Sequence, residues 1–179
     1  MERYLRVMKP ALRFRPADIR LLASQYDYGI DDEPLKALAP KVFKQQFLTK
    51  QQLRVVAKWK APRSSGYMES NQSQYVKEVT AIALCAVSER ARIETLTLLD
   101  GVSWPTASVI LHYFHRDRYP ILDFRALWSV GLKPPPKYNF EFWWVYVKYC
   151  RALAKSNRID MRTLDRALWQ YSKEHQSFK

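Results

Sequence analysis

A glycine between two apolar runs is the first place in this sequence where chemistry could occur. The stretch LLDGVSWPTASVIL, residues 98–111, contains Gly101, one of four glycines in the chain. Glycine supports the backbone turn that ends a helix, and Pro105 suits the first position of the next helix, with Ser103 or Trp104 at its cap. The stretch therefore predicts two helices joined by a tight hairpin. The converging N–H groups of such a hairpin can bind a phosphate without reading base sequence, although an ordinary helical hairpin has the same pattern.

A single carboxylate follows further along, after a basic segment. The sequence HRDRYPILDFRALW places Asp123 at the start of a predicted short helix, with Arg116, Arg118 and Arg125 around it. Aspartate is a common N-cap, so local capping alone explains this residue. The arginines are suited to DNA phosphates, or else to a solvated surface. Taken alone, these residues leave the role of the carboxylate open.

The hairpin and the aspartate together resemble the helix-hairpin-helix (HhH-GPD) DNA glycosylase superfamily, which includes endonuclease III-like and alkyladenine-type enzymes. The family signature is L-P-G-V-G-x-x-T-A, then a helix, then an aspartate that begins a further helix. The matching positions here are Leu99, Gly101, Val102, Thr106, Ala107 and Asp123. The later segments FEFWWVYVKYCRALAKS and LDRALWQYSK are similar to the closing helices of the family. The resemblance covers about residues 90–174.

The resemblance implies a DNA glycosylase that depends on one carboxylate. Cleavage of an N-glycosidic bond develops positive charge on the sugar, and a fixed carboxylate stabilises that charge and orients or deprotonates the attacking water. The resemblance assigns this catalytic role to Asp123. Eight residues are candidates for binding the DNA backbone: Gly101, Val102, Ser103, Trp104, Thr106, Arg116, Arg118 and Arg125.

The chain departs from the signature in ways that change the expected chemistry. Asp100 replaces the proline before the glycine, Ser103 replaces the second glycine, and Pro105 stands where bifunctional members carry a lysine. Proline cannot attack the sugar to form a Schiff base, so we expect a monofunctional enzyme that leaves an abasic site. The two cysteines, Cys85 and Cys150, exclude a four-cysteine iron–sulfur cluster or zinc site.

The target base must leave the helix stack before its bond to the sugar can be reached. An aromatic-lined pocket would hold the extruded base, and a wedge would fill the gap. Four residues are candidates for these roles: Trp59, Tyr67, Asn71 and Trp104. Taken singly, a residue of each of these types is more often part of the core or of plain surface. His112 and His115 have a spacing that could bind a metal, but no third ligand is evident, and we expect neither a metal nor a cofactor.

Charge and composition agree with a nucleic-acid partner. Thirty Lys and Arg against 17 Asp and Glu give the 179-residue chain a net charge of +13, which favours a polyanion over a merely solvated basic surface. No apolar run is long enough to span a membrane, and the N-terminal segment lacks the apolar core of a secretory signal. We expect a cytoplasmic, nucleoid-associated monomer that binds double-stranded DNA.

Helical periodicity runs through nearly the whole chain, without a strand pattern or an internal repeat. This pattern predicts an all-α chain, and the resemblance implies a glycosylase-like single domain over residues 1–179, with two helical lobes around a cleft. The hairpin lies at about 91–115 and an N-terminal lobe at about 1–70. Predicted helices lie at about 17–27, 34–47 (with Pro40 as a potential break), 50–60, 72–87, 91–99, 105–115, 124–130, 139–155 and 160–174. Predicted N-caps are Thr49, Asn71 and Asp160, and the clearest breaks are 61–72 and 133–137.

Three functions are consistent with the sequence. The first is a monofunctional DNA glycosylase that releases a damaged or chemically modified base, either in DNA repair or, for modified phage DNA, in antiviral defence. The second is a non-catalytic helix-hairpin-helix DNA-binding protein in which Asp123 only caps a helix. The third is a basic helical protein that binds RNA or an acidic partner. The sequence does not identify the base.

Overall fold

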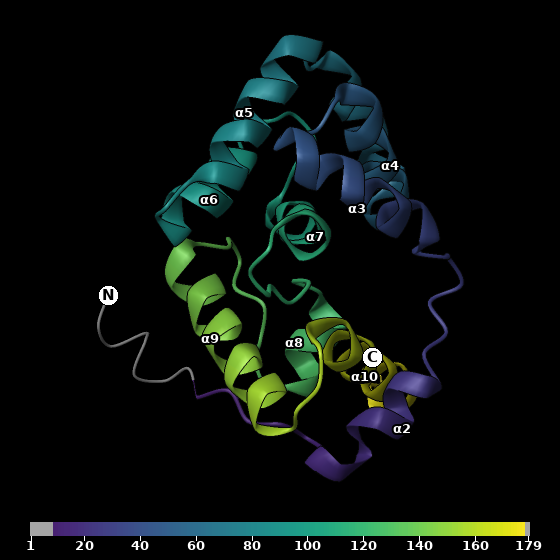
Figure 1. Ribbon diagram of the computed structural model, residues 1–179. Helices are drawn as coiled ribbons and strands as arrows, with labels where there is room; N and C mark the ends of the chain where they lie inside the picture. Colours follow the sequence, from purple (N-terminus) through teal and green to yellow (C-terminus); the bar gives the residue numbers. More distant parts are fainter. Residues whose placement is uncertain (1–8, 178–179) are drawn as a thin grey trace. The chain divides into compact units, whose positions relative to one another are not determined.

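The computed structural model describes residues 9–177 and is helical, with no strand in that part of the chain (Figure 1). The expected all-α class is thereby confirmed. The described residues fall into two compact units. The hairpin unit comprises Gly29–Arg118. The aspartate unit comprises the described residues of Met1–Tyr28 together with those of Tyr119–Lys179. The division thus falls near residues 28 and 118, whereas the sequence pattern placed a lobe boundary at about residue 70.

In the hairpin unit, α7 provides most of the core. Its apolar sequence WPTASVILHYF buries side chains on every face, as expected of a helix with neighbours all around it. The helices α3, α4 and α6 all pack against it. The elements of this unit are α3 (Glu33–Gln45), α4 (Lys50–Lys60), the 3₁₀ helix η2 (Pro62–Ser70), α5 (Ser73–Cys85), α6 (Glu89–Leu96) and α7 (Trp104–Phe114).

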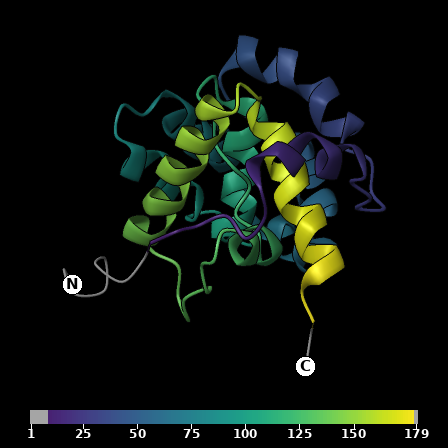
Figure 2. The same cartoon turned by 90° about the horizontal axis from the view of Figure 1, so that it is seen from below.

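In the aspartate unit, α10 packs against α2, α8 and α9, and its position beside α2 is visible in Figure 2. The extended segment before α2 is tied to the end of α8, because Ala11 N–H donates to the Val130 carbonyl at 2.9 Å and Arg13 N–H to the Ser129 carbonyl at 2.9 Å. The elements are the 3₁₀ helix η1 (Pro16–Asp18), α2 (Ile19–Ser24), α8 (Phe124–Ser129), α9 (Phe140–Ser156) and α10 (Met161–His175).

Local capping signals located several helix starts correctly. Thr49 opens α4 with a capping box, in which its hydroxyl accepts from Gln52 N–H at 3.2 Å and the Gln52 side chain accepts from Thr49 N–H at 2.8 Å. Asp160 caps α10 by accepting from Thr163 N–H at 2.7 Å. Both predicted caps are confirmed, and the predicted helix 50–60 has the observed bounds.

Other predicted boundaries differ from the observed ones, and one potential break is absent. Pro40 lies inside α3 without breaking it, because Leu35 and Val42 on the same helix are fully buried and hold both sides of the missing bond. The predicted helix 17–27 is a 3₁₀ turn followed by a helix that ends at Ser24. The predicted break 61–72 contains the 3₁₀ helix η2.

Two expectations close to the hairpin also need correction. Pro105 occupies the second position of α7 rather than the first, since the helix begins at Trp104 with Ser103 as its N-cap. Asn71 does not cap α5. Gln72 is the N-cap of that helix and makes no capping bond with its side chain, because the Asn71 side chain is used for long-range bonds described below.

Candidate nucleic-acid interface and carboxylate site

The predicted hairpin is present and turns at Gly101. After α6 ends, Leu99 N–H donates to the Leu96 carbonyl at 3.3 Å and Val102 N–H to the Leu99 carbonyl at 3.0 Å. Gly101 has φ = +77°, a left-handed conformation that glycine adopts at little cost. The side chain of Ser103 makes no capping bond to α7. The N-terminus of α7, where the positive end of the helix dipole lies, is therefore not covered by a side-chain cap.

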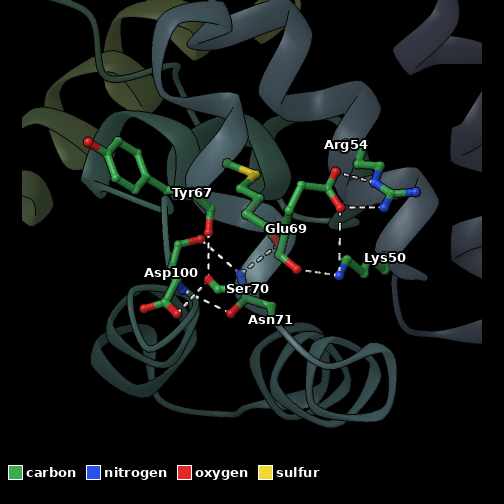
Figure 3. A network of polar contacts seen from close by, with 8 residues as sticks. Lys50, Arg54, Tyr67, Glu69, Ser70, Asn71 and Asp100 are labelled. Atoms are coloured by element: carbon green, nitrogen blue, oxygen red, sulfur yellow. Dashed lines mark hydrogen bonds and ion pairs between the residues drawn. The ribbon is translucent and has the colours of Figure 1, made fainter.

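A buried asparagine holds this turn from a distance of 29 residues (Figure 3). The Asn71 amide nitrogen donates to the Asp100 carbonyl at 2.9 Å and to the Met68 carbonyl at 3.1 Å. Its amide oxygen accepts from Asp100 N–H at 3.0 Å. The Ser70 hydroxyl donates to the Asp100 carboxylate at 2.8 Å. We call Ser70, Asn71 and Asp100 the hairpin clamp. Asn71 was a candidate for the base pocket or the wedge, but its side chain is buried and its amide groups bond the turn.

The clamp brings η2 so close to the turn that a side chain at residue 101 would collide with it. A Cβ at Gly101 would lie 2.8 Å from Met68 Cγ, 3.1 Å from Met68 N and 3.2 Å from Tyr67 Cβ. Contacts this short force a neighbour to move, and the backbone N of Met68 cannot move without disturbing η2. The steric contact and the left-handed backbone conformation therefore both favour glycine at residue 101.

A second set of bonds fixes η2 to α4. The Glu69 carboxylate forms an ion pair with Arg54, and Lys50 Nζ donates to the Glu69 carbonyl at 2.6 Å (Figure 3). The hydrogen bonds from Arg54 lower the pKa of Glu69 below its ordinary value. Two residues before Glu69, Tyr67 is 71% exposed. Its ring points away from the polar network in Figure 3. The polar segment that the sequence predicted as a break is therefore tethered, and it presents an aromatic ring beside the hairpin.

Asp123 lies at the start of α8, as predicted. Its Oδ1 accepts from Arg125 N–H at 2.9 Å, so the local interpretation as an N-cap is confirmed. The two residues before it, Ile121 and Leu122, are buried. The hydroxyl of the buried Tyr146 donates to the Ile121 carbonyl at 3.1 Å. Core packing and this bond hold the backbone that carries the carboxylate.

Two aromatic residues near Asp123 were not among the sequence-based candidates. Phe124 is next in the chain and 47% exposed, with the Arg125 guanidinium 5.3 Å from its ring centroid. Tyr138 is half-buried, and burial together with the negative charge of Asp123 raises its pKa. The sequence shows that Phe124 follows the aspartate, but it does not show that the ring stays exposed. Tyr138 lies 15 residues away, so no local pattern joins it to Asp123.

The remaining candidates are distributed over both units. Trp59 is buried in the core, where its ring meets that of Tyr113 edge-on at 5.9 Å, so the expected role in a pocket or wedge is replaced by packing. Trp104 is half-buried. The other hairpin candidates are Val102 and Thr106, which are buried, and Ser103, Arg116 and Arg118, which are exposed. Arg125 belongs to the aspartate unit, where its guanidinium also lies 5.3 Å from the centroid of the Trp169 ring.

Acidic side chains, rather than histidines, form the one metal-compatible group found among residues 9–177. This group consists of Asp31, Asp32 and Glu33. Lys36 Nζ lies 2.9 Å from the Asp32 carboxylate and 2.7 Å from that of Glu33, and the Tyr113 hydroxyl donates to Asp32 at 2.9 Å. Because the Lys36 ammonium already pairs with two of the three carboxylates, we assign no metal to them. His112 and His115 do not form part of such a group.

No helix in residues 9–177 has the length and apolar character needed to cross a membrane. Comparisons of the chain with protein-family models, with curated proteins and with solved structures found no match.

Proposed function

We propose that this protein is a monofunctional DNA glycosylase that hydrolyses the N-glycosidic bond of an extruded, damaged or chemically modified base. The observation that carries the proposal is the clamped glycine hairpin, followed at the family spacing by an aspartate that begins a helix. The net charge of +13 supports a DNA partner. The proposal is tested by incubating the protein with duplexes that carry such bases and measuring free base and abasic sites.

In this proposal the hairpin grips the DNA backbone. The N–H groups at the start of α7 offer hydrogen bonds and a positive dipole end to a phosphate, while the N–H groups of Asp100 and Val102 hold the turn itself. The hairpin clamp fixes the orientation of these groups before binding, so little conformational entropy is lost when the phosphate binds. Contacts of this kind position the duplex and carry no sequence information.

Asp123 supplies the charge that the reaction needs. Arg125 N–H occupies Oδ1 of the carboxylate and thereby fixes the direction of Oδ2. A carboxylate held in this way can stabilise the oxocarbenium-like sugar and orient the attacking water without reorganising during the reaction. No covalent enzyme–sugar intermediate is required, and the product is free base with an abasic site in an intact strand.

Two exposed aromatic rings suit base extrusion. Tyr67, beside the hairpin, is the candidate for the wedge that fills the gap in the stack, since it is exposed and the residues that follow it, Glu69 and Ser70, are bonded to α4 and to the turn. Phe124, next to the carboxylate, is the candidate for stacking against the extruded base. Trp104 remains a candidate for either role.

A non-catalytic helix-hairpin-helix DNA-binding protein is the second candidate function. The observation in its favour is that Asp123 already caps α8, a role that needs no catalysis. The two functions differ in one product, because only a glycosylase generates abasic sites in the DNA that it binds.

DNA binding should depend steeply on salt. Phosphate contacts release counterions, so the logarithm of the affinity should fall linearly with the logarithm of the salt concentration. A protein that contacts about four phosphates loses roughly a hundredfold in affinity between 50 and 200 mM salt. A fluorescence anisotropy titration of a labelled duplex measures this slope. An affinity that is unchanged over this range would contradict the assignment of the hairpin and the arginines to phosphate.

Borohydride should trap no covalent protein–DNA adduct. Trapping requires an amine that attacks the sugar to form a Schiff base, and Pro105 occupies the position where the resemblance would place the lysine. We expect no shifted band on a denaturing gel and no strand cleavage beyond the slow background at abasic sites. A strong adduct would show that another lysine serves as nucleophile and that the monofunctional mechanism is wrong.

A further inference from the structure

Helix α9 has one face in the core and one basic face. The buried side chains include Trp143, Tyr146 and Cys150. Lys148 and Lys155, two helical turns apart, are exposed on the opposite side. Arg151 lies at the edge of the same side, with its guanidinium 4.5 Å from the Tyr119 ring centroid and 5.4 Å from that of Trp144.

The turn after α9 adds further positively charged side chains. Arg158 is exposed and has φ = +50°, a left-handed conformation in which glycine or asparagine is more common at the end of a helix. The side chain of Arg20 donates to the Arg158 carbonyl at 3.1 Å, which places a further guanidinium at the turn. We call Arg20, Lys148, Arg151, Lys155 and Arg158 the α9 basic face.

Intramolecular ion pairs do not account for the exposed members of this face. Within residues 9–177, Lys148, Lys155 and Arg158 take part in no ion pair. The single acidic residue of α9 is Glu141, which lies in its first turn, about 10 Å along the axis from Lys148. The helix dipole favours cations in the last turn of α9, which explains Lys155 but not Lys148 in the middle of the helix.

We propose that the α9 basic face is a second binding surface for the phosphate backbone of DNA, separate from the hairpin. The flexible lysine ammonium groups would bind phosphates together with the guanidinium groups, one of which is held against aromatic rings and the others at the turn. A membrane surface fits less well, because α9 contributes none of the large exposed apolar side chains that an interfacial helix inserts. This inference rests on the DNA partner of the proposed function, but the surface takes part in binding only and requires no base cleavage.

The test compares two double variants that remove the same charge from exposed helix positions. Lys148→Gln/Lys155→Gln removes two cations of the α9 basic face. Lys41→Gln/Lys44→Gln removes two exposed cations of α3 and serves as the matched control. Anisotropy titrations of a labelled 20-base-pair duplex over a series of salt concentrations give affinity and salt slope for each variant. Thermal melts check that both remain folded, as expected for substitutions at exposed sites.

The α9 variant should bind the duplex about tenfold or more weakly at low salt. Its salt slope should fall by about 1.8, because each phosphate that is no longer neutralised lowers the slope by about 0.9. The α3 control should keep the wild-type slope. Equal small reductions in affinity in both variants would show a merely solvated face and would overturn the proposal, as would weaker binding to phosphatidylserine vesicles with unchanged binding to DNA. The test measures binding alone, so an unchanged affinity and salt slope in the α9 variant would overturn this proposal and leave the glycosylase proposal to the base-release assay.

Discussion

Replacing Asp123 with asparagine should slow base release about 10²–10³-fold under single-turnover conditions. The amide oxygen can still accept the bond from Arg125 N–H, so the start of α8 should survive. The negative charge that stabilises the developing oxocarbenium is removed, and a decrease of about 3–4 kcal/mol in transition-state stabilisation corresponds to this rate change. The measurement is the rate of free-base formation from a cleavable duplex at saturating protein.

Asp160→Asn is the matched control for this substitution. Asp160 caps α10 as Asp123 caps α8, with a backbone N–H bonded to the carboxylate. The control makes the same chemical change at a helix start to which no chemistry is assigned, so it should keep the wild-type rate. Asp123→Asn should keep its thermal stability and bind DNA slightly more tightly, because a negative charge near phosphates is removed. Wild-type turnover in this variant would reduce Asp123 to a helix cap.

Replacing Gly101 with alanine should destabilise the hairpin unit and weaken DNA binding. The left-handed backbone costs alanine about 1–2 kcal/mol. The new Cβ would also lie 2.8 Å from Met68 Cγ, and overpacking of this kind costs a further ~1–3 kcal/mol. If η2 moves to relieve the contact, the hairpin clamp is disturbed and the N–H groups lose their alignment. We expect a lower denaturation midpoint and a duplex affinity reduced by about tenfold or more.

Gly29 provides a control with the same backbone conformation. Its φ is also +77°, but a Cβ at this position would meet no atom within 4 Å. Gly29→Ala should therefore show the conformational cost alone, with DNA affinity unchanged. The difference between the two variants in the free energy of unfolding, measured with denaturant, gives the cost of the contact between a Cβ at residue 101 and η2. Equal destabilisation in both variants would contradict the close approach of η2 to the turn.

Short-range signals explain which parts of the fold were predictable. Thr49 and Asp160 bond to residues three positions away, so the sequence shows both partners of each cap at once. Gly101 between two apolar runs marks the turn for the same reason. Helical periodicity likewise depends on neighbours within two turns, and it located α4, α9 and α10 within about one residue at each end.

Long-range partners explain what was missed. Asn71 precedes a helix and has the residue type of an N-cap, but it bonds Asp100, 29 positions away, and no pattern in the sequence joins the two. The sequence also did not show which aromatic side chains are exposed to solvent. Trp59 and Phe124 are both aromatic residues in helical patterns, yet the first is buried and the second is exposed. The family signature and the local capping pattern both predicted that Asp123 begins a helix. The proximity of Tyr138 to Asp123, in contrast, depends on the tertiary fold.

Direct detection of a released base tests the proposed activity most simply. Wild-type protein is incubated with a panel of duplexes that carry alkylated, oxidised, deaminated and mismatched bases, together with modified phage DNA. Mass spectrometry measures the free base, and alkaline cleavage of the same samples measures abasic sites. We predict that at least one substrate yields free base and an equal amount of abasic sites in strands that stay intact before alkali, and that Asp123→Asn forms both products far more slowly. Duplexes that are bound tightly but release no base anywhere in the panel would contradict the glycosylase proposal and leave a DNA-binding protein.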